Sequence, residues 1–599
     1  MTDNSAYISA PKDSQAQLRR GREAYEVGDL KTAHSICTAI LSKNNNEPDA
    51  LQLLSAVTLQ QSDTRTAIEL ARRCVAADPN NPHYRNTLGL AYRAYGNFET
   101  AIKEFDKAID ILPNMIESHA NKASVLIDTG RYELAIHAID AVFAETPNNP
   151  LLLSNKGVAL SHLGRNDEAL PFLTQAQKIW PNSIEICRNK LMVLNYCADA
   201  TAETIRQETD MFWSLQEAPE IREQAHGHAR HQAQSGKRPL RIGYVSADFR
   251  THPVGLLLEP VLAQLDRDQV QTFLYSNHPG RDWLTETLES YCTENRSIFR
   301  ASDSEACKQI RNDNIDILVD LSGHTDGNRL PLFRHKPAPV QMTWLGYGGT
   351  TGLKAIDYII TDKHVWVDSD ETHFSEKPLK MPNLHFCFRP HDKRINVADI
   401  AQDGQQPFVF GCFNNVSKFS EQLIRQWSRI LAAVPESKLM IKNPKLGKGD
   451  VSRSITSFCS GNGISPERLL LVGETNFEDH LSMYKCVDVA LDPYPYNGTM
   501  STLDAFWMGV PVVMLEGNRW LARVGSAMAT EVGIPDLICK TEEEYVEKAI
   551  TLARQPETVR ALRKSLRVIL GSSPVCDAKG FARSLENLYR QAWQAWCIG

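Results

Sequence analysis

DVALDPYPYNGTMSTLDAFWMGVPVVMLEG, residues 488–517, is the stretch that most narrowly limits the architecture of the C-terminal part of the chain. A short apolar run of strand type (DVALDPY) leads into a polar glycine turn, a helical pattern, and a second strand-like run (GVPVVMLEG). Two buried strands joined through a helix are typical of a parallel sheet, because a parallel connection needs a crossover that covers one sheet face. The segment therefore predicts an α/β sheet.

The same alternation of strand-like runs and helical patterns extends upstream to residue 240. The further runs are LRIGYVSAD (240–248), QTFLYSN (271–277), IDILVDLSG (315–323), PVQMTWLGY (339–347), DYIITD (357–362), FVFGCFN (408–414), KLMIKN (438–443) and RLLLVGE (468–474). They fall into two groups that separate near residues 390–405. We expect two doubly wound, Rossmann-like lobes at 237–395 and 405–599, with ligands bound at the carboxyl ends of the strands.

The first third of the chain instead repeats with a period of 34 residues. The recurring positions are proline 79, 113, 147 and 181, alanine 33, 67, 101, 135 and 169, and glycine 28, 96, 130 and 164, with serine at 62. Glycine permits a tight turn, alanine permits close helix packing, and proline ends a helix. The unit resembles the tetratricopeptide repeat. We expect about five repeats over 14–183, forming an α superhelix, and a helical connector over 184–236.

Stacked repeats of this kind leave a concave surface that binds extended peptides, which predicts acceptor proteins or peptides as partners. Asn121 and Asn155 precede the small residue of the first helix in two successive repeats. Their side-chain amides would hydrogen-bond the backbone of a bound peptide. The alternative is that both are solvated polar residues on a helix face.

Composition and charge exclude several classes of protein. The formal net charge of −7 disfavours a nucleic-acid partner, because proteins that neutralise a phosphate backbone are usually basic. No run approaches the roughly 18–20 apolar residues of a membrane span, and the N-terminal residues do not have the pattern of a signal peptide. The 13 cysteines lack any CxxC pair, as in reduced proteins. We expect a cytoplasmic protein that does not insert into membranes.

Polar residues follow the strand-like runs of the first lobe. His252 lies in SADFRTHPVG (246–255), where a lone histidine is more often structural or solvated than catalytic. Asp320 and His324 lie in DLSGHTDGNR (320–329). Gly346 lies in WLGYGGTTG (344–352), a glycine-rich turn whose backbone N–H groups could approach a sugar or phosphate.

The second lobe carries the stronger signals for a nucleotide sugar. Lys418 follows a strand in FGCFNNVSK (410–418), and an ammonium group there suits a diphosphate that gains charge as it departs. The turn NGTMST (497–502) precedes a helix that contains Asp504. Hydroxyls and helix N-terminal amides suit phosphate, whereas a carboxylate suits ribose hydroxyls.

Taken together, these motifs resemble the protein O-linked N-acetylglucosamine transferase family (glycosyltransferase family 41), and within it the bacterial SPINDLY-type branch. The segments that carry the resemblance are HP (252–253), DLSGHT (320–325), WLGY (344–347), DYIITD (357–362), LDPYPYNG (491–498), MGVPVV (508–513) and ARVGSA (522–527). The resemblance covers nearly the whole chain. It implies a GT-B fold and an inverting transfer of N-acetylglucosamine from UDP-N-acetylglucosamine to Ser or Thr hydroxyls, with no metal and no cofactor.

The resemblance also implies roles for particular residues. His252 matches the active-site histidine, and Lys418 matches the diphosphate-binding lysine. The positions that it implies for donor binding are Asn415, Lys418, His480, Asn497, Gly498, Thr499, Ser501, Thr502, Asp504 and Gly346. The general base stays open between His252, Asp320 and His324. Two departures from the family pattern, Met500 and Ser417, bear on which sugar and nucleotide are used.

Three other functions stay open at this point. SPINDLY-type relatives include O-fucosyltransferases that use GDP-fucose, and a more distant branch resembles N-glucosyltransferases that use UDP-glucose. The third is an inactive tetratricopeptide scaffold that only binds peptide or nucleotide. The presence of His252, Lys418, His480 and Asp504 argues against the scaffold.

Overall fold

The computed structural model describes residues 12–215, 238–390, 397, 407–447 and 449–598. The chain divides into two compact units between Ala159 and Leu160. Residues 216–237 of the expected connector and first lobe, and residues 391–396 and 398–406 around the expected boundary between the lobes, lie outside the described residues.

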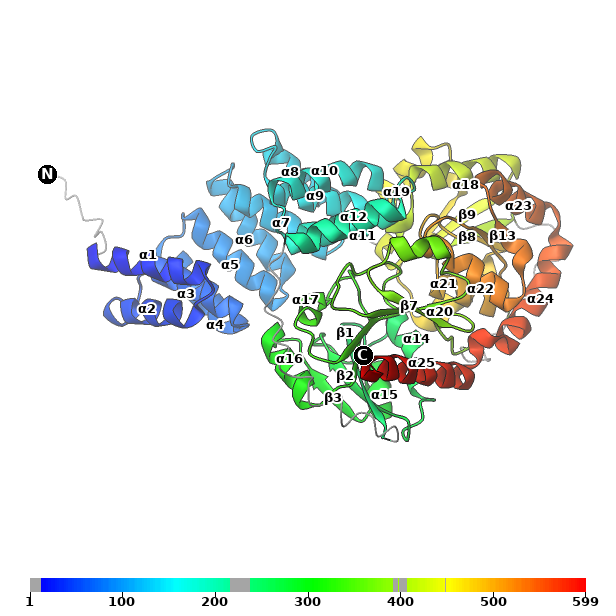
Figure 1. The fold of residues 1–599 in the computed structure, drawn as a ribbon. Helices are drawn as coiled ribbons and strands as arrows, with labels where there is room; N and C mark the ends of the chain where they lie inside the picture. The colour runs from blue at the N-terminus through cyan, green and yellow to red at the C-terminus, as the bar shows by residue number, and fades with distance from the viewer. Residues whose placement is uncertain (1–11, 216–237, 391–396, 398–406, 448, 599) are drawn as a thin grey trace. The chain divides into compact units, whose positions relative to one another are not determined.

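The first unit is built from helix pairs, as the 34-residue period predicts (Figure 1). Its helices are α1 (Lys12–Glu26), α2 (Leu30–Lys43), α3 (Pro48–Gln60), α4 (Thr64–Ala77), α5 (Pro82–Tyr95), α6 (Phe98–Ile111), α7 (Ile116–Asp128), α8 (Tyr132–Phe143) and most of α9 (Pro150–His162). Each glycine of the periodic column has a positive φ, between 73° and 86°, and Ser62 has φ 63°. The column is therefore a set of left-handed turns, which glycine adopts without steric cost.

The second unit begins with α10 (Asn166–Ile179), α11 (Ile184–Tyr196) and α12 (Ala202–Ser214) and continues into a seven-stranded parallel sheet. In sheet order the strands are β3 (Glu294–Ser297), β2 (Val270–Ser276), β1 (Leu240–Ser246), β4 (Ile317–Asp320), β5 (Val340–Thr343), β6 (Tyr358–Asp362) and β7 (Lys377–Met381). The helices of this lobe are α14 (Pro253–Leu262), α15 (Trp283–Tyr291), α16 (Asp303–Asn312) and α17 (Leu330–Phe333). The strand order reverses between β1 and β4.

The second lobe has a six-stranded parallel sheet, and its order reverses between β8 and β11. In sheet order the strands are β10 (Leu469–Val472), β9 (Lys438–Lys442), β8 (Val409–Cys412), β11 (Val489–Leu491), β12 (Val512–Leu515) and β13 (Ile538–Cys539). Its helices are α18 (Glu421–Ala433), α19 (Gly449–Gly461), α20 (Phe477–Met483), α21 (Met500–Trp507), α22 (Val524–Val532), α23 (Glu542–Arg554) and α24 (Pro556–Ser572). Two parallel sheets of this kind confirm the expected pair of Rossmann-like lobes.

The sequence patterns missed β3, β7 and β13, all of which lie at sheet edges. The sequence of β3 is ENRS, and most of its residues are exposed, so no apolar run marks it. In β7 the sequence KPLKM combines a proline with lysines, which edge strands tolerate. β13 has only two residues.

The last helix, α25 (Ala578–Ile598), packs on the first lobe and not on the second, where the sequence analysis placed it. Phe581, Tyr589 and Trp593 join the core that contains the strands β1, β4 and β5. The hydroxyl of Tyr589 lies 3.0 Å from the hydroxyl of Tyr244 in β1. The end of the chain therefore ties the two lobes together.

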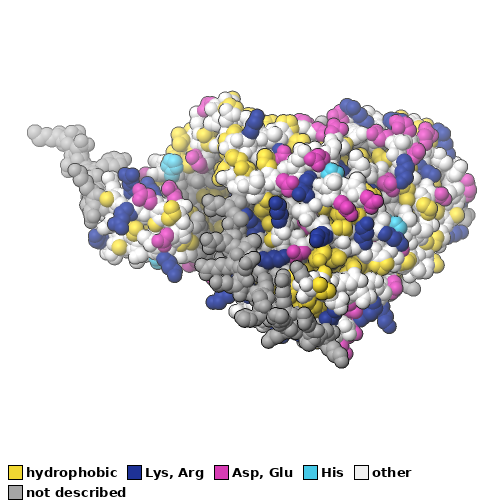
Figure 2. All heavy atoms as spheres, viewed as in Figure 1, with side chains coloured by type: hydrophobic (Ala, Val, Ile, Leu, Met, Phe, Trp, Pro, Cys, Tyr) yellow, Lys and Arg dark blue, Asp and Glu magenta, His cyan; other side chains and the backbone are white. Residues whose placement is uncertain are grey.

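Charged side chains are mixed over the face that Figure 2 shows, with basic and acidic groups interspersed over the lobes. This distribution agrees with the overall negative charge, and the described residues on that face do not form a basic stripe. In the described parts of the chain, none of the helices is both long and apolar enough to cross a membrane.

Candidate active site

The predicted site residues follow strands at the two points where the sheet order reverses. His252 follows β1 and Asp320 ends β4, whereas Lys418 follows β8 and the turn at 497–502 follows β11. In open α/β sheets, ligands bind outside the carboxyl ends of the strands at such reversal points. Both lobes therefore present their candidate residues at the expected edge.

Lys418 of the second lobe is held by two hydrogen bonds and a ring contact. Its ammonium nitrogen donates to the backbone carbonyl of Asn497 at 2.8 Å and to Oδ1 of Asn414 at 3.3 Å. The same nitrogen lies 4.3 Å from the centre of the Tyr496 ring, in a cation–π contact. An ammonium has three N–H donors, so a direction remains for a ligand oxygen. Burial lowers the pKa of Lys418 to about 8, because the charged form loses hydration.

Asp492, at the end of β11, organises the turn that the sequence analysis assigned to phosphate. Its Oδ1 accepts hydrogen bonds from the Gly498 N–H at 2.9 Å and from the Thr502 hydroxyl at 3.3 Å. A Cβ on Gly498 would come within 3.0 Å of the side chains of Asp492 and Thr502, so a larger residue would displace the groups that hold the turn. Burial raises the pKa of Asp492, and the neighbouring Lys418 charge partly opposes this shift.

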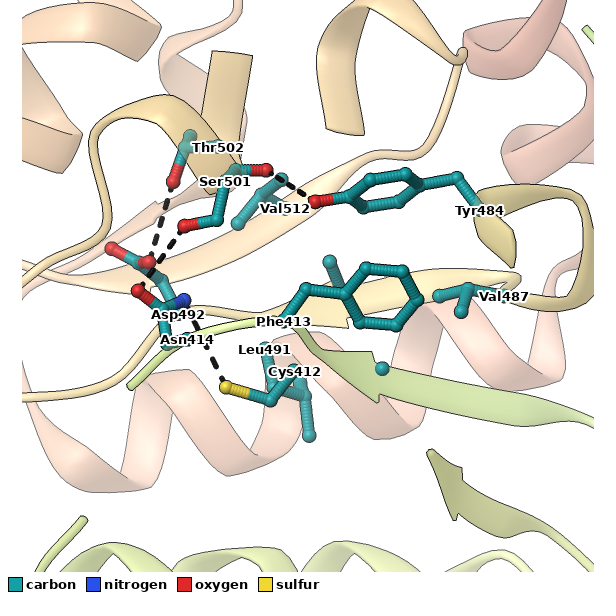
Figure 3. A pocket seen from close by; sticks show the side chains of 12 residues that line it. Cys412, Phe413, Asn414, Tyr484, Val487, Leu491, Asp492, Ser501, Thr502 and Val512 are labelled. Carbon is teal, nitrogen blue, oxygen red and sulfur yellow. Dashed lines mark hydrogen bonds between the residues drawn. The ribbon is translucent and has the colours of Figure 1, made fainter. Parts of the chain in front are cut away.

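Asn414, one residue before the predicted Asn415, bridges the two strand ends (Figure 3). Its Oδ1 accepts from both Lys418 and the Ser501 hydroxyl, the latter at 3.1 Å. Tyr484 donates its hydroxyl to the Ser501 carbonyl at 2.9 Å. The cavity between these side chains measures about 10 Å³, room for about one water, so it forms the floor of the site and not a nucleotide pocket.

Two asparagines predicted to bind the donor make contacts within the protein. Asn415 is exposed, and its side chain accepts from the Ser417 N–H at 3.2 Å, which caps the short helix Val416–Lys418. Asn497 is buried, and its side chain joins the Pro493 carbonyl to the Gly525 N–H. Asn414, one residue earlier, is the asparagine whose side chain contacts Lys418, and donor binding by Asn415 stays a prediction. Only the backbone carbonyl of Asn497 reaches the lysine.

The remaining second-lobe residues gather at the start of α21. Thr499 is its N-terminal cap, and Ser501 and Thr502 lie in its first turn, where backbone N–H groups have no acceptor within the helix. Asp504 is buried in the same helix, and its Oδ2 lies 3.7 Å from Nε2 of His480 in α20. The structure thus brings together the hydroxyls, the amides and the carboxylate expected to bind a nucleotide.

His252 caps α14 in the first lobe. Its Nδ1 accepts a hydrogen bond from the Val254 N–H at 3.3 Å, and Asp248 Oδ2 lies 3.6 Å from the same nitrogen. Burial lowers the pKa of His252, and the Asp248 carboxylate partly opposes this. A neutral imidazole that accepts at Nδ1 carries its proton on Nε2. In that tautomer His252 carries an N–H donor at Nε2.

Asp320 and His324 are engaged elsewhere. Asp320 is fully buried and accepts from the N–H groups of Ser322 and Gly323 and from the Thr343 hydroxyl, at 2.8–3.1 Å. His324 is buried, its Nε2 lies 3.0 Å from the Thr351 carbonyl, and burial lowers its pKa to about 4. Both stabilise loops at the strand ends, which leaves them poorly suited to take a proton from an acceptor.

Gly346 is explained by packing. Its N–H donates to the Trp344 carbonyl, and a Cβ would lie 1.9 Å from the Leu321 carbonyl oxygen. The Gly346 N–H is thus engaged within the turn, and a role of this turn in donor binding stays a prediction. In the first unit, Asn121 donates to Asn86 Oδ1 at 3.0 Å and Asn155 donates to the Ala120 carbonyl at 3.1 Å. Each asparagine thus links neighbouring repeats.

Comparison with known proteins gives the family. Residues 212–397 and 397–585 match the model of glycosyl transferase family 41. The chain belongs to glycosyltransferase family 41. In the repeats of this family 41 chain, residues 121–184 match the tetratricopeptide repeat model, and residues 60–142 match the model of anaphase-promoting complex, cyclosome, subunit 3.

Plant proteins are similar to this family 41 chain. The probable UDP-N-acetylglucosamine–peptide N-acetylglucosaminyltransferase SPINDLY of Solanum lycopersicum is 33% identical over 430 residues, 70% of this chain and 45% of that protein. The protein of the same name from Hordeum vulgare is 35% identical over 60% of this chain and 39% of its own length. The chain thus spans less than half the length of these curated relatives.

A solved structure is similar over the whole length of the family 41 chain. It is a Lys-to-Met mutant of the Thermobaculum terrenum O-GlcNAc transferase, with a TM-score of 0.67 and 28% sequence identity. The similarity covers 98% of this chain and 99% of that chain. The expected combination of tetratricopeptide repeats with a GT-B fold, and the resemblance to O-GlcNAc transferases, are confirmed.

Proposed function

We propose that this chain transfers N-acetylglucosamine from UDP-N-acetylglucosamine to Ser or Thr hydroxyls of proteins, with inversion at the anomeric carbon. Membership of family 41 and similarity to an O-GlcNAc transferase structure support the reaction class. The observation that carries the proposal is the position of Lys418. Its ammonium group is fixed beside the turn at the start of α21, at the reversal point of the second sheet.

In the proposed reaction the acceptor hydroxyl oxygen bonds to the anomeric carbon while the bond from that carbon to the diphosphate oxygen breaks. The proton of the hydroxyl passes to water or to a phosphate oxygen of the UDP. The electron pair of the broken bond passes to the departing UDP. Lys418 and the first-turn amides of α21 stabilise this developing charge. Electrostatic stabilisation by preorganised groups is usually the largest single contribution to catalysis of this kind. Asp504 and His480 stand where the ribose and nucleotide would bind.

We assign His252 the role of a hydrogen-bond donor to the substrates. Its Nδ1 accepts from the Val254 N–H, so Nε2 carries the proton of the neutral ring. A general base would need the opposite tautomer, with a free lone pair facing the acceptor. The geometry therefore favours positioning of a donor or acceptor oxygen over proton abstraction by this residue.

We propose that the reaction needs no metal. Lys418 and the N-terminus of α21 supply positive charge at the place where a divalent ion would otherwise neutralise the diphosphate. Within the described residues, His, Cys, Asp and Glu side chains do not form groups of three or more that could hold a metal ion.

The acceptor proteins would bind along the helical repeats, because a stacked array of helix pairs presents a continuous surface to an extended chain. Asn121 and Asn155 each use one amide N–H between repeats. A side-chain amide has two N–H groups and an oxygen, so both residues retain the capacity to bind a peptide backbone.

The test is incubation of the purified chain and of Lys418→Ala with UDP-N-acetylglucosamine, UDP-glucose and GDP-fucose, together with host lysate. Release of nucleoside diphosphate and protein mass shifts are measured. A Lys418-dependent gain of N-acetylhexosamine on Ser or Thr supports the proposal. Preference for UDP-glucose or GDP-fucose would assign the chain to one of the sibling activities, and no transfer with any donor would favour the peptide-binding scaffold.

A further inference from the structure

The segment that carries Lys418 is held by the helical repeats within the second unit. The turn between α9 and α10 lies against residues 415–419, and these contacts join residues more than 250 positions apart in the chain. A lysine at the end of a strand is free to move unless its backbone is held on both sides. The contacts of this turn therefore bear directly on where the ammonium group lies.

Asn166, the first residue of α10, makes the central contact. Its amide nitrogen donates to the Ser417 carbonyl at 2.8 Å and to the Phe419 carbonyl at 3.0 Å. These two carbonyls are on either side of Lys418. The amide is oriented by the Ser161 hydroxyl, which donates to Asn166 Oδ1 at 2.7 Å. Asn166 is only 1% exposed, so its side chain is committed to these contacts.

Asn166 also departs from the repeat pattern. The first residues of the second helices in the preceding repeats are Leu30, Thr64, Phe98 and Tyr132. The last repeat alone has a residue with a side-chain amide at this position. Such an amide can donate two hydrogen bonds to adjacent carbonyls, which no residue of the other repeats can do from a neutral side chain.

Two neighbours complete the contact. Nδ1 of His162 lies 3.4 Å from the Ser417 hydroxyl and 3.1 Å from the Lys445 ammonium nitrogen. Burial lowers the pKa of His162 to about 3, so the neutral ring accepts from the lysine. Gly164 has φ 79°, and a Cβ there would lie 3.1 Å from the Val416 carbonyl oxygen. The turn and the lysine segment are thus closely fitted.

We propose that Asn166 is a positioning residue for Lys418, which holds the backbone on both sides of the lysine and so aims the ammonium group at the donor diphosphate. This role rests on the proposed function of Lys418 in binding that diphosphate. It also makes the last helical repeat a part of the donor site. Packing against the last repeat then explains why residue 417 is a small, buried serine, because its hydroxyl and carbonyl both contact the turn between α9 and α10. The identity of the donor sugar is not needed to explain this residue.

The test is a double-mutant cycle on the full chain with UDP as the probe. UDP affinity is measured by calorimetry for the wild type, Asn166→Ala, Lys418→Ala and the double variant. We expect Asn166→Ala to raise the UDP Kd about tenfold, as the loss of a well-placed pair of hydrogen bonds would. We expect the same change to have less than about a twofold effect when Lys418 is already alanine, because the effect acts through the lysine.

Two further variants separate positioning from a general loss of stability. Asn166→Asp keeps the shape of the side chain but replaces the N–H donor with a carboxylate oxygen, which the Ser417 and Phe419 carbonyls repel. It should therefore weaken UDP binding at least as much as alanine does. Asn97→Ala removes the N-terminal cap of α6, where Asn97 accepts from the Thr100 N–H, and should leave the UDP Kd unchanged. Steady-state kinetics of Asn166→Ala should show a raised donor KM, which partial unfolding would not produce.

The results decide separately on the positioning role of Asn166 and on the diphosphate-binding role of Lys418. A wild-type UDP Kd in Asn166→Ala, an undiminished effect in the Lys418→Ala background, or an equal effect of Asn97→Ala would overturn the positioning role. If Lys418→Ala itself leaves UDP affinity and turnover unchanged, the assigned function of the lysine fails instead. If Lys418→Ala is severely impaired while both Asn166 variants behave as wild type, only the positioning role fails.

Discussion

The ammonium nitrogen of Lys418 donates to the backbone carbonyl of Asn497 across 2.8 Å, which joins the segment after β8 to the turn after β11. The two strands are neighbours at the reversal point of the second sheet. Because the acceptor is a backbone carbonyl, the contact depends on the path of the turn and not on the side chain of Asn497. The lysine is therefore fixed at the start of α21, where an anion would be stabilised by the helix N-terminus.

Lys418→Ala should lower kcat roughly 100- to 1,000-fold, because it removes a preorganised donor to the departing diphosphate. Turnover is measured from nucleoside diphosphate release at saturating donor. Lys564→Ala is the matched control, since Lys564 is exposed on α24. Wild-type turnover in Lys418→Ala would remove the lysine from the mechanism.

UDP affinity should fall as the pH rises through about 8, the pKa to which burial lowers Lys418. The charged lysine binds phosphate, and bound phosphate raises its pKa again. Below pH 8 the free protein is already protonated, so affinity is full. Above it, binding requires proton uptake, and the Kd rises up to about tenfold per pH unit. Calorimetry at several pH values checks this, and the profile of Lys418→Ala should lack this dependence.

His252→Asn should retain far more activity than His252→Ala. Asparagine keeps both an oxygen that accepts from the Val254 N–H and an N–H donor, and it is a good N-terminal cap. We expect about a 100-fold loss of kcat for alanine and a loss within about tenfold for asparagine. Equal inactivity of the two variants, with the folded state retained, would instead point to a general base at this position.

Gly164→Ala and Gly96→Ala should each destabilise the fold by about 1–2 kcal/mol, because both glycines have a positive φ. Only Gly164→Ala should also weaken UDP binding. A Cβ at 164 presses on the Val416 carbonyl oxygen, whereas one at 96 meets nothing within 4 Å. Thermal unfolding and UDP calorimetry on both variants separate the two effects. Equal UDP affinities would mean that the α9–α10 turn does not influence the lysine segment.

Donor turnover should be unchanged by a chelator, since Lys418 and the start of α21 supply the positive charge at the proposed diphosphate position. The measurement is nucleoside diphosphate release with and without chelator after exhaustive dialysis. Loss of activity that added Mg²⁺ or Mn²⁺ restores would show that a metal takes part.

The order of elements could be predicted from the sequence because it depends on neighbours along the chain. The 34-residue column of glycines predicted turns between helices, and the structure shows that these turns are left-handed, including the one at Ser62. Apolar runs predicted the central strands, whose burial gives them a continuous hydrophobic pattern. The edge strands β3 and β13 were not predicted, because β3 is polar and β13 is very short.

The candidate site was predictable only as a region. The motif after β8 indicated an asparagine beside Lys418, but a shift of one residue at the end of the strand puts Asn414 toward the lysine and leaves Asn415 exposed. Asp492 had no signal of its own, because a single aspartate after a strand is common. Its role appears only with Gly498 and Thr502 folded against it.

Periodicity, turn residues and strand-end motifs in the sequence were sufficient for the repeats and the two lobes, and they indicated Lys418 as the candidate cation of the donor site. Contacts between distant parts of the chain came only from the tertiary structure. Asn166 contacts the segment that carries Lys418, and α25 packs on the first lobe. Asp320 and His324 form hydrogen bonds within loops. The reason is physical. Local patterns reflect backbone sterics and the burial of one face, whereas contacts between distant residues depend on how completed elements pack together.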